Sequence, residues 1–128
     1  HEGIGEVVEL GSNVQQASIA VGDRVGIPWI HQTCQRCEYC LTGREEFCLK
    51  LIRSGVTVDG CFAQYVLMNA EFAVKLPSGM DPYASAPLYC AGVTMYKALK
   101  TASVRAGEWI SIVGIGGLGK KLFDAIEK

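Results

Sequence analysis

Four cysteines within fifteen residues constrain this chain more than any other feature of its sequence. They follow the pattern Cys-x2-Cys-x2-Cys-x7-Cys, at Cys34, Cys37, Cys40 and Cys48. A C-x2-C turn presents two thiolates to one ion, and Zn²⁺ binds four such ligands at tetrahedral corners about 2.3 Å away. Because four thiolates leave no open position on the metal, the pattern predicts a structural zinc site and not a catalytic one.

Two other interpretations of these cysteines carry less weight. An iron–sulfur cluster can use three-residue spacing, but the segment lacks the Cys-Pro that ends the bacterial ferredoxin motif. Disulfides are typical of secreted chains, whereas the start His1-Glu2-Gly3 has neither the basic residues nor the apolar stretch of a secretion signal. We therefore expect reduced thiols, a bound metal and a cytoplasmic location.

The composition is that of an ordinary globular domain. The 128 residues are 49% hydrophobic and 20% charged, which excludes a disordered chain. The net charge of −1 gives no basic patch of the kind that a nucleic-acid-binding protein needs. No apolar run approaches the roughly 18 residues that span a bilayer. We therefore expect neither nucleic acid nor a membrane as a partner.

Outside the four cysteines, His1 and Cys90 are the other plausible metal ligands. A catalytic zinc needs three protein ligands and an open fourth position, so these two residues offer only part of a site. His31 is a conceivable third ligand, although no spacing supports it. From the residues alone the ordinary alternative stays open, in which the histidine is structural and the cysteine packs in the core.

Short strands are expected in most of the chain and helices near its end. Gly-bounded and β-branched segments predict strands over 3–10, 24–30, 61–68, 72–76 and 109–113. This order of elements indicates a β-rich domain followed by the start of an α/β domain.

A helix is expected to begin at Asp81, which can cap it, with Pro82 in its first turn. Pro87 should divide this helical stretch into two. A second helical pattern covers residues 122–128.

A glycine-rich loop separates the expected strand 109–113 from that last helix. Its glycines Gly114, Gly116 and Gly119 match the G-x-G-x-x-G pattern of dinucleotide-binding loops. Gly114 would make the turn, Gly116 would let the backbone approach a pyrophosphate, and Gly119 would let helix and strand pack closely. The acidic residue expected about 20 positions further on lies past the last residue, so NAD and NADP are not distinguished.

Taken in order, these segments resemble the zinc-dependent medium-chain alcohol dehydrogenases, most closely the bacterial and yeast-like branch that acts on primary alcohols. The resemblance runs from His1 to about Gly119. Besides the four cysteines, the matching segments are HEGIGEV (1–7), VGDRV (21–25), VDG (58–60), AVKLP (73–77), CAGVT (90–94), YKA (96–98) and GIGGLG (114–119).

The resemblance implies an α+β fold in two parts. Residues 1–103 would form a GroES-like catalytic domain, a partly open β-barrel that carries a cysteine lobe at 31–53 for the structural zinc. Residues 104–128 would begin a truncated Rossmann domain that binds NAD(P), as its first βα unit.

The resemblance also implies roles for individual residues. His1 and Cys90 would bind the catalytic zinc, and Glu2 would lie beside that metal as a neighbouring carboxylate or exchangeable ligand. Trp29 would form a wall of the substrate pocket, and Thr94 would lie near the nicotinamide. The dinucleotide would be bound by Gly114, Gly116, Gly117, Leu118 and Gly119.

The activity implied is the zinc-dependent interconversion of a primary alcohol and an aldehyde, with NAD(P), by preference NAD, as hydride acceptor in a homodimer or homotetramer. The family's first strands, with the first catalytic cysteine, and most of its cofactor domain have no counterpart here. The tail 120–128 also departs from the family's mostly apolar helix. We therefore expect a fragment that is inactive alone. The alternatives are a non-catalytic zinc-binding remnant or interaction module, and a related polyol or formaldehyde dehydrogenase.

Overall fold

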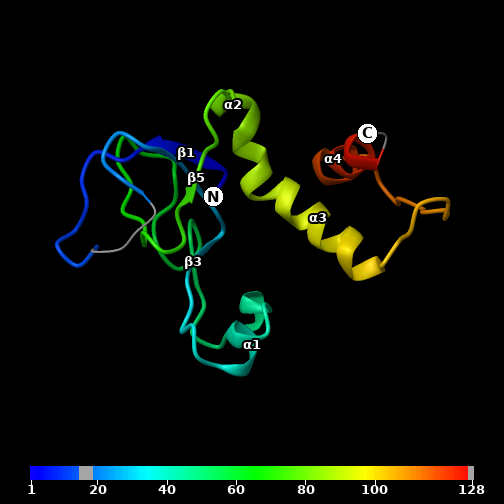
Figure 1. Cartoon of the computed structure of the whole chain (residues 1–128), viewed down its shortest axis with the longest axis horizontal. Coiled ribbons are helices and arrows are strands. Elements are labelled where there is room, and N and C mark those ends of the chain that lie inside the picture. Colours follow the sequence, from blue (N-terminus) through cyan, green and yellow to red (C-terminus); the bar gives the residue numbers. More distant parts are fainter. Residues whose placement is uncertain (15–18, 127–128) are drawn as a thin grey trace.

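The computed structural model describes residues 1–14 and 19–126 (Figure 1). In chain order the elements are β1 (Gly3–Glu6), β2 (Arg24–Ile27), β3 (Ile30–Gln32), α1 (Glu38–Leu41), the 3-10 turn η1 (Glu45–Phe47), β4 (Ile52–Arg53), β5 (Val74–Lys75), α2 (Pro82–Ser85), the 3-10 turn η2 (Ala86–Tyr89), α3 (Ala91–Ala102) and α4 (Gly117–Ile126).

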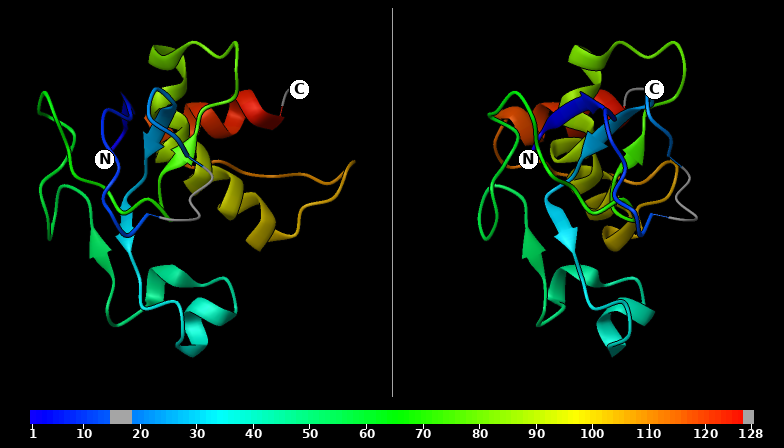
Figure 2. Two further views of the ribbon diagram at one scale, coloured as in Figure 1. Left: turned by 60° about the vertical axis from the view of Figure 1, so that its left-hand side comes forward. Right: turned by 90° about the vertical axis from the view of Figure 1, so that its left-hand side faces the viewer.

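Two small antiparallel sheets form the β part of the fold. The first has the order β1-β2-β5, with Gly3 opposite Ile27 and Val25 opposite Lys75. The second pairs β3 with β4 and leads into the cysteine lobe. Figure 2 shows this lobe, with α1, projecting from the sheets on its two strands. Over the described residues both sheets stay open and no barrel closes, which agrees with the expected partly open form.

The apolar core is small and centres on β2. Val25 and Ile27 on this strand are buried, and Leu76 joins them from the end of β5. The other buried apolar residues are Ile19, Cys48, Leu51 and Ala91. β2 is the middle strand of its sheet, so it is covered on both edges.

The expected helix start and its division are confirmed. Both carboxylate oxygens of Asp81 accept hydrogen bonds from the first turn of α2, from Tyr83 N at 3.3 Å and Ala84 N at 3.1 Å. Pro87 lies in η2, which separates α2 from α3 as predicted. The last helix, α4, begins at Gly117, earlier than expected, and residues 127–128 of the prediction lie outside the described residues.

Two of the expected strands, 61–68 and 109–113, are wrong. Neither segment has a regular element in the structure. Phe62 is 108% exposed and Trp109 is 101% exposed. A strand is held by ladder bonds to a neighbour and by a covered face, and the described chain pairs neither segment with another strand. Both segments have the hydrophobic pattern of a strand, but the described chain gives them no neighbouring strand to pair with.

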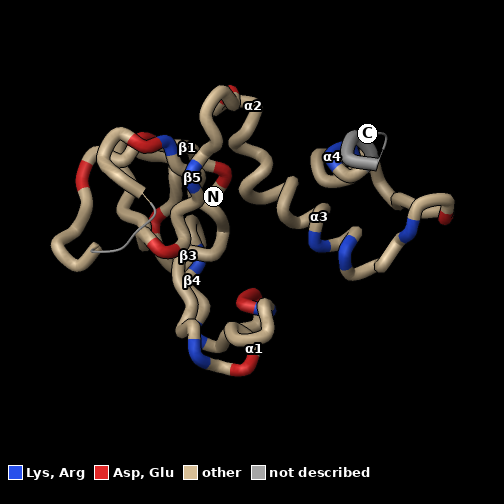
Figure 3. Tube along the Cα trace, viewed as in Figure 1, with Lys and Arg blue, Asp and Glu red and all other residues tan. Residues whose placement is uncertain are grey.

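Charged residues of both signs occur along the described chain. Figure 3 shows acidic and basic residues interspersed along the trace. Among the described residues, no helix combines the length and apolar character that crossing a bilayer requires.

Gly26 allows β2 and η2 to pack together, because a side chain there would meet the ring of Tyr89. We predict that Gly26→Ala lowers the free energy of unfolding by about 1–3 kcal/mol, the usual cost of overpacking. The measurement is urea unfolding in the presence of zinc. Gly5→Ala is the matched control, since Gly5 lies on the adjacent strand with open space around it. An unfolding midpoint for Gly26→Ala equal to that of Gly5→Ala would contradict this packing.

Candidate metal centres and the adjoining cleft

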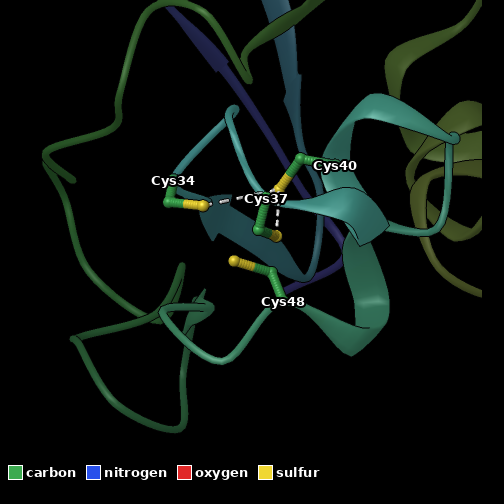
Figure 4. Close-up of side chains that lie close together, drawn as sticks. All are labelled: Cys34, Cys37, Cys40 and Cys48. Carbon is green, nitrogen blue, oxygen red and sulfur yellow. Dashed lines mark hydrogen bonds between the residues drawn. The ribbon is translucent and has the colours of Figure 1, made fainter.

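The four cysteines of the lobe meet at one point. Cys34 follows β3, Cys37 caps α1, Cys40 lies within α1, and Cys48 follows η1. Figure 4 shows their side chains directed toward one another, and all four Sγ atoms lie within 4.8 Å of one another. The Cys37–Cys40 and Cys34–Cys40 sulfur distances are 3.5 and 3.9 Å. A tetrahedral zinc with 2.3 Å bonds requires sulfur separations of about 3.8 Å, so the cluster fits one zinc ion.

The backbone between the first two cysteines adopts an unusual conformation. Gln35 has φ 54°, in the left-handed region that non-glycine residues rarely occupy. Its side-chain amide donates a hydrogen bond to Glu71 Oε2 at 2.6 Å. This contact from outside the lobe tethers the turn between Cys34 and Cys37 to Glu71.

The lobe favours the thiolate at some of its cysteines and disfavours it at another. Backbone N–H groups of Arg36 and Cys37, together with neighbouring thiols, lower the pKa of Cys34 to about 6. The backbone N–H of Cys40 favours the Cys37 thiolate, but desolvation and the other cysteines prevail and raise the pKa of Cys37 to about 11. Negative charge in the metal-free cluster therefore concentrates first on Cys34.

A buried hydroxyl also favours a thiolate in the cluster. Thr33 Oγ1 is buried and makes no hydrogen bond of good geometry with any described group. Its proximity lowers the pKa of Cys40. A thiolate at Cys40 would give this hydroxyl the acceptor that it lacks, which supports metal-ligated sulfur at this position.

Little apolar packing holds the lobe together. Cys48 and Leu51 are buried, whereas Leu41, Phe47 and Leu49 are exposed. Lys97 of α3 touches the lobe from outside, with Nζ 3.4 Å from Gly43 O and 3.9 Å from a carboxylate oxygen of Glu46. Exposed contacts of this kind contribute at most about 1 kcal/mol. Apolar packing therefore contributes little to the order of the lobe, and a metal ion held by the four cysteines would supply folding free energy there.

His1 and Cys90, far apart in sequence, meet at a second place. His1 Nε2 lies 3.0 Å from Cys90 Sγ, a hydrogen-bond distance. Burial raises the pKa of Cys90, and the nearby Glu2 carboxylate raises it further. Zinc bound by both atoms would hold them about 3.5 Å apart, so a small adjustment would let them share an ion. His1 and Cys90 provide two strong ligands, and Glu2 provides a carboxylate close to Cys90.

The structure does not bring His31 to this place. His31 lines a separate cavity with Val58, Gly60 and Phe62, and burial lowers its pKa. In the part of the chain that the structure describes, the four lobe cysteines are the one group of three or more candidate ligands close enough to share an ion.

An open cleft of about 820 Å³ separates the lobe from α3 and contains His1 and Cys90. Trp29 and Thr94 line it, at the positions where the resemblance places a pocket wall and a nicotinamide neighbour. Val93 and Lys97 line it as well and were not predicted. The sequence could have indicated them, because positions 90, 93, 94 and 97 have the spacing of residues on one face of a helix.

The glycine loop has the backbone that its pattern predicts. Gly114 has φ 93°. Gly119 leaves no room for a side chain against the carbonyl of Gly114. The N–H of Lys120 bonds to Gly116 O at 2.9 Å as α4 begins. The loop and helix are therefore formed, whereas the strand expected before them is not.

The comparisons agree with this fold. Residues 1–78 match the family model described as the alcohol dehydrogenase GroES-like domain. Because the match covers more than half of the chain, the chain belongs to this family. A curated relative, an alcohol dehydrogenase of Geobacillus stearothermophilus, is 53% identical over 119 residues, which are 93% of this chain and 34% of the relative.

Solved structures share the architecture. A cinnamyl alcohol dehydrogenase of Sorghum bicolor matches with a TM-score of 0.84 and 32% identity, covering 95% of this chain and 37% of that one. The CAD protein of Helicobacter pylori, solved with NADP(H), matches with a TM-score of 0.86 and 27% identity, covering 98% of this chain and 38% of that one. The chain thus spans little more than a third of the proteins that it resembles.

We predict that the purified chain binds closer to one zinc than two, and that Cys40→Ser removes most of it. The four-sulfur shell is complete within the chain, whereas His1 and Cys90 form only part of a site. Metal analysis after gel filtration measures the zinc content. Cys61→Ser is the matched control, since Cys61 lies outside the cluster. Zinc content that survives Cys40→Ser would contradict the assignment.

The pKa order in the lobe predicts an order of alkylation. In the metal-free chain at pH 7, Cys34 should react first with iodoacetamide, since with a pKa of about 6 it is mostly thiolate, the reactive form. Cys37, with its raised pKa, should react late. Peptide mass spectrometry after a short pulse reads the order, and added zinc should protect both. Equal labelling of the two cysteines in the metal-free chain would contradict it.

Proposed function

We propose that this chain supplies the metal-binding part of a zinc-dependent alcohol dehydrogenase that interconverts a primary alcohol and an aldehyde. The observation that carries the proposal is the meeting of His1 and Cys90 inside one cleft, with the Glu2 carboxylate close to Cys90. A histidine and a thiol of raised pKa, beside a carboxylate, match part of the two-cysteine, one-histidine set of alcohol dehydrogenases. The 53% identical relative, itself an alcohol dehydrogenase, supports this reading.

In this proposal each site residue has a defined task. His1 and Cys90 hold a catalytic zinc, which when bound polarises the alcohol oxygen as a Lewis acid. Glu2 sets the local charge beside Cys90. Trp29 bounds the space for the substrate carbon chain, and Thr94 lies one turn into α3 beside the expected nicotinamide. A third protein ligand would come from outside this chain.

The cleft favours a neutral substrate. Glu45, Glu46 and Glu71 are among its lining residues, and they outnumber the one lysine there, Lys97. Carboxylates in a partly enclosed space repel an anionic substrate. A small primary alcohol meets no such barrier.

The cofactor is proposed to be NAD(P), by preference NAD. The supports are the left-handed Gly114 and the tight approach at Gly119, with Gly116, Gly117 and Leu118 between them at the start of α4. The N–H groups at a helix start bind phosphate oxygens. We place the boundary between the catalytic and cofactor domains at 103/104, and propose a cytoplasmic homo-oligomer for the whole enzyme.

A non-catalytic zinc module remains the second candidate for the isolated polypeptide. The observation that favours it is the incomplete ligand set at His1 and Cys90, beside a complete one in the cysteine lobe. The two proposals differ in the activity that they predict when the chain is placed in a complete enzyme. The first predicts a working enzyme, and the second predicts an inactive one.

A chimaera tests the proposal directly. The matched 119 residues replace their counterpart in the Geobacillus stearothermophilus alcohol dehydrogenase. We predict NAD-dependent ethanol oxidation by the chimaera and none by the isolated chain, because misplacing the reacting groups by about 1 Å can cost roughly 100-fold. Cys90→Ala should abolish the chimaera's activity, and Cys61→Ser should leave it. A folded chimaera that binds zinc yet is inactive would support the non-catalytic alternative.

A further inference from the structure

Trp29 forms part of the cleft wall. It lies between β2 and β3, half-buried, and lines the same cleft as His1 and Cys90. Its backbone is fixed, since Trp29 O accepts a hydrogen bond from Ser54 N at 2.9 Å. That bond leaves the indole free to rotate about its side-chain torsions, so something else must set the orientation of the ring.

The guanidinium of Arg53 lies over this ring. Arg53 Cζ is 5.2 Å from the centroid of Trp29, within the roughly 6 Å range of a cation–π contact, for which tryptophan is the best partner. The described residues offer the Arg53 side chain no carboxylate at salt-bridge distance, in contrast to Arg44, which stacks on Tyr39 and also pairs with Glu38. The indole is thus the one partner that the described chain gives this guanidinium.

The backbone of Arg53 is held independently of its side chain. Its N–H donates to Thr57 Oγ1 at 2.7 Å. Its carbonyl accepts from the N–H groups of Val56, Thr57 and Val58 at 3.0–3.3 Å. The turn after β4 therefore anchors the start of the side chain, and the stacked guanidinium is presented from a fixed base.

We propose that Arg53 is a positioning residue for the cleft: its guanidinium covers one face of Trp29 and holds the indole in a single orientation as the cleft wall. A planar cation that stacks on a ring restricts rotation more than a point charge does. Loss of this contact frees the ring to turn and admits solvent to the covered face. The importance of this wall for substrates rests on the proposed function, whereas the orientation of the ring does not.

Quenching of Trp29 fluorescence by acrylamide tests the proposal without any need for catalysis. The chain has two tryptophans, so the measurement uses a Trp109→Phe background, which removes the fully exposed one. In zinc-loaded protein we expect Arg53→Met to raise the quenching constant about twofold, as a ring face opens. Arg53→Lys should give an intermediate value, and Arg44→Met, the matched control, should give no change.

A further variant separates the side chain from the turn that carries it. Thr57→Val removes the hydrogen bond to Arg53 N but keeps the backbone hydrogen bonds to the Arg53 carbonyl, which hold the base of the guanidinium in place. The proposal expects the quenching of Trp29 in this variant to stay near that of the parent. An unchanged quenching constant in Arg53→Met would overturn it. So would an equal rise in Thr57→Val and Arg53→Met, because the turn and not the guanidinium would then hold the ring. If the chimaera is inactive while the quenching results are as expected, the proposed activity is refuted and the positioning role of Arg53 is not.

Discussion

Four sulfur atoms converge on one point and organise the cysteine lobe, which borders the cleft that His1 and Cys90 line. The cysteine lobe offers almost no apolar interior, since Cys48 and Leu51 are its buried hydrophobic residues. Three of the four cysteines lie in or beside two short helical turns, α1 and η1, which would not persist alone in water. A zinc ion bound by all four thiolates would stabilise these turns, because its binding free energy contributes to folding. The lobe then forms one wall of the cleft.

A chain of packing contacts assembles the second group of ligands. Gly26 in β2 accepts the ring of Tyr89 against its backbone. This places the end of η2, and therefore Cys90, beside β1, which begins two residues after His1. Two residues 89 positions apart thus come within hydrogen-bond distance. The cleft between them and the lobe is a consequence of how the sheet and helix pack, and Trp29, with the Arg53 guanidinium over its ring, forms part of the cleft wall.

Features that depend on neighbours in sequence were predictable, and features that depend on distant partners were less so. The cysteine spacing, the cap at Asp81 and the break at Pro87 are local, and the structure has each of them. The strands expected at 61–68 and 109–113 are absent because pairing partners decide whether an apolar segment becomes a strand. No spacing in the sequence indicates the stacking of Arg53 on Trp29, since the contact arises only when β3 and β4 pair.

We infer that one zinc ion bound by four thiolates orders the lobe that borders the cleft of His1 and Cys90. X-ray absorption at the zinc edge of the purified chain measures the ligand shell of that ion directly. We predict four sulfur atoms at about 2.3 Å and no nitrogen or oxygen ligand. A shell with mixed nitrogen or oxygen donors, or cysteines found as disulfides with no zinc bound, would contradict it.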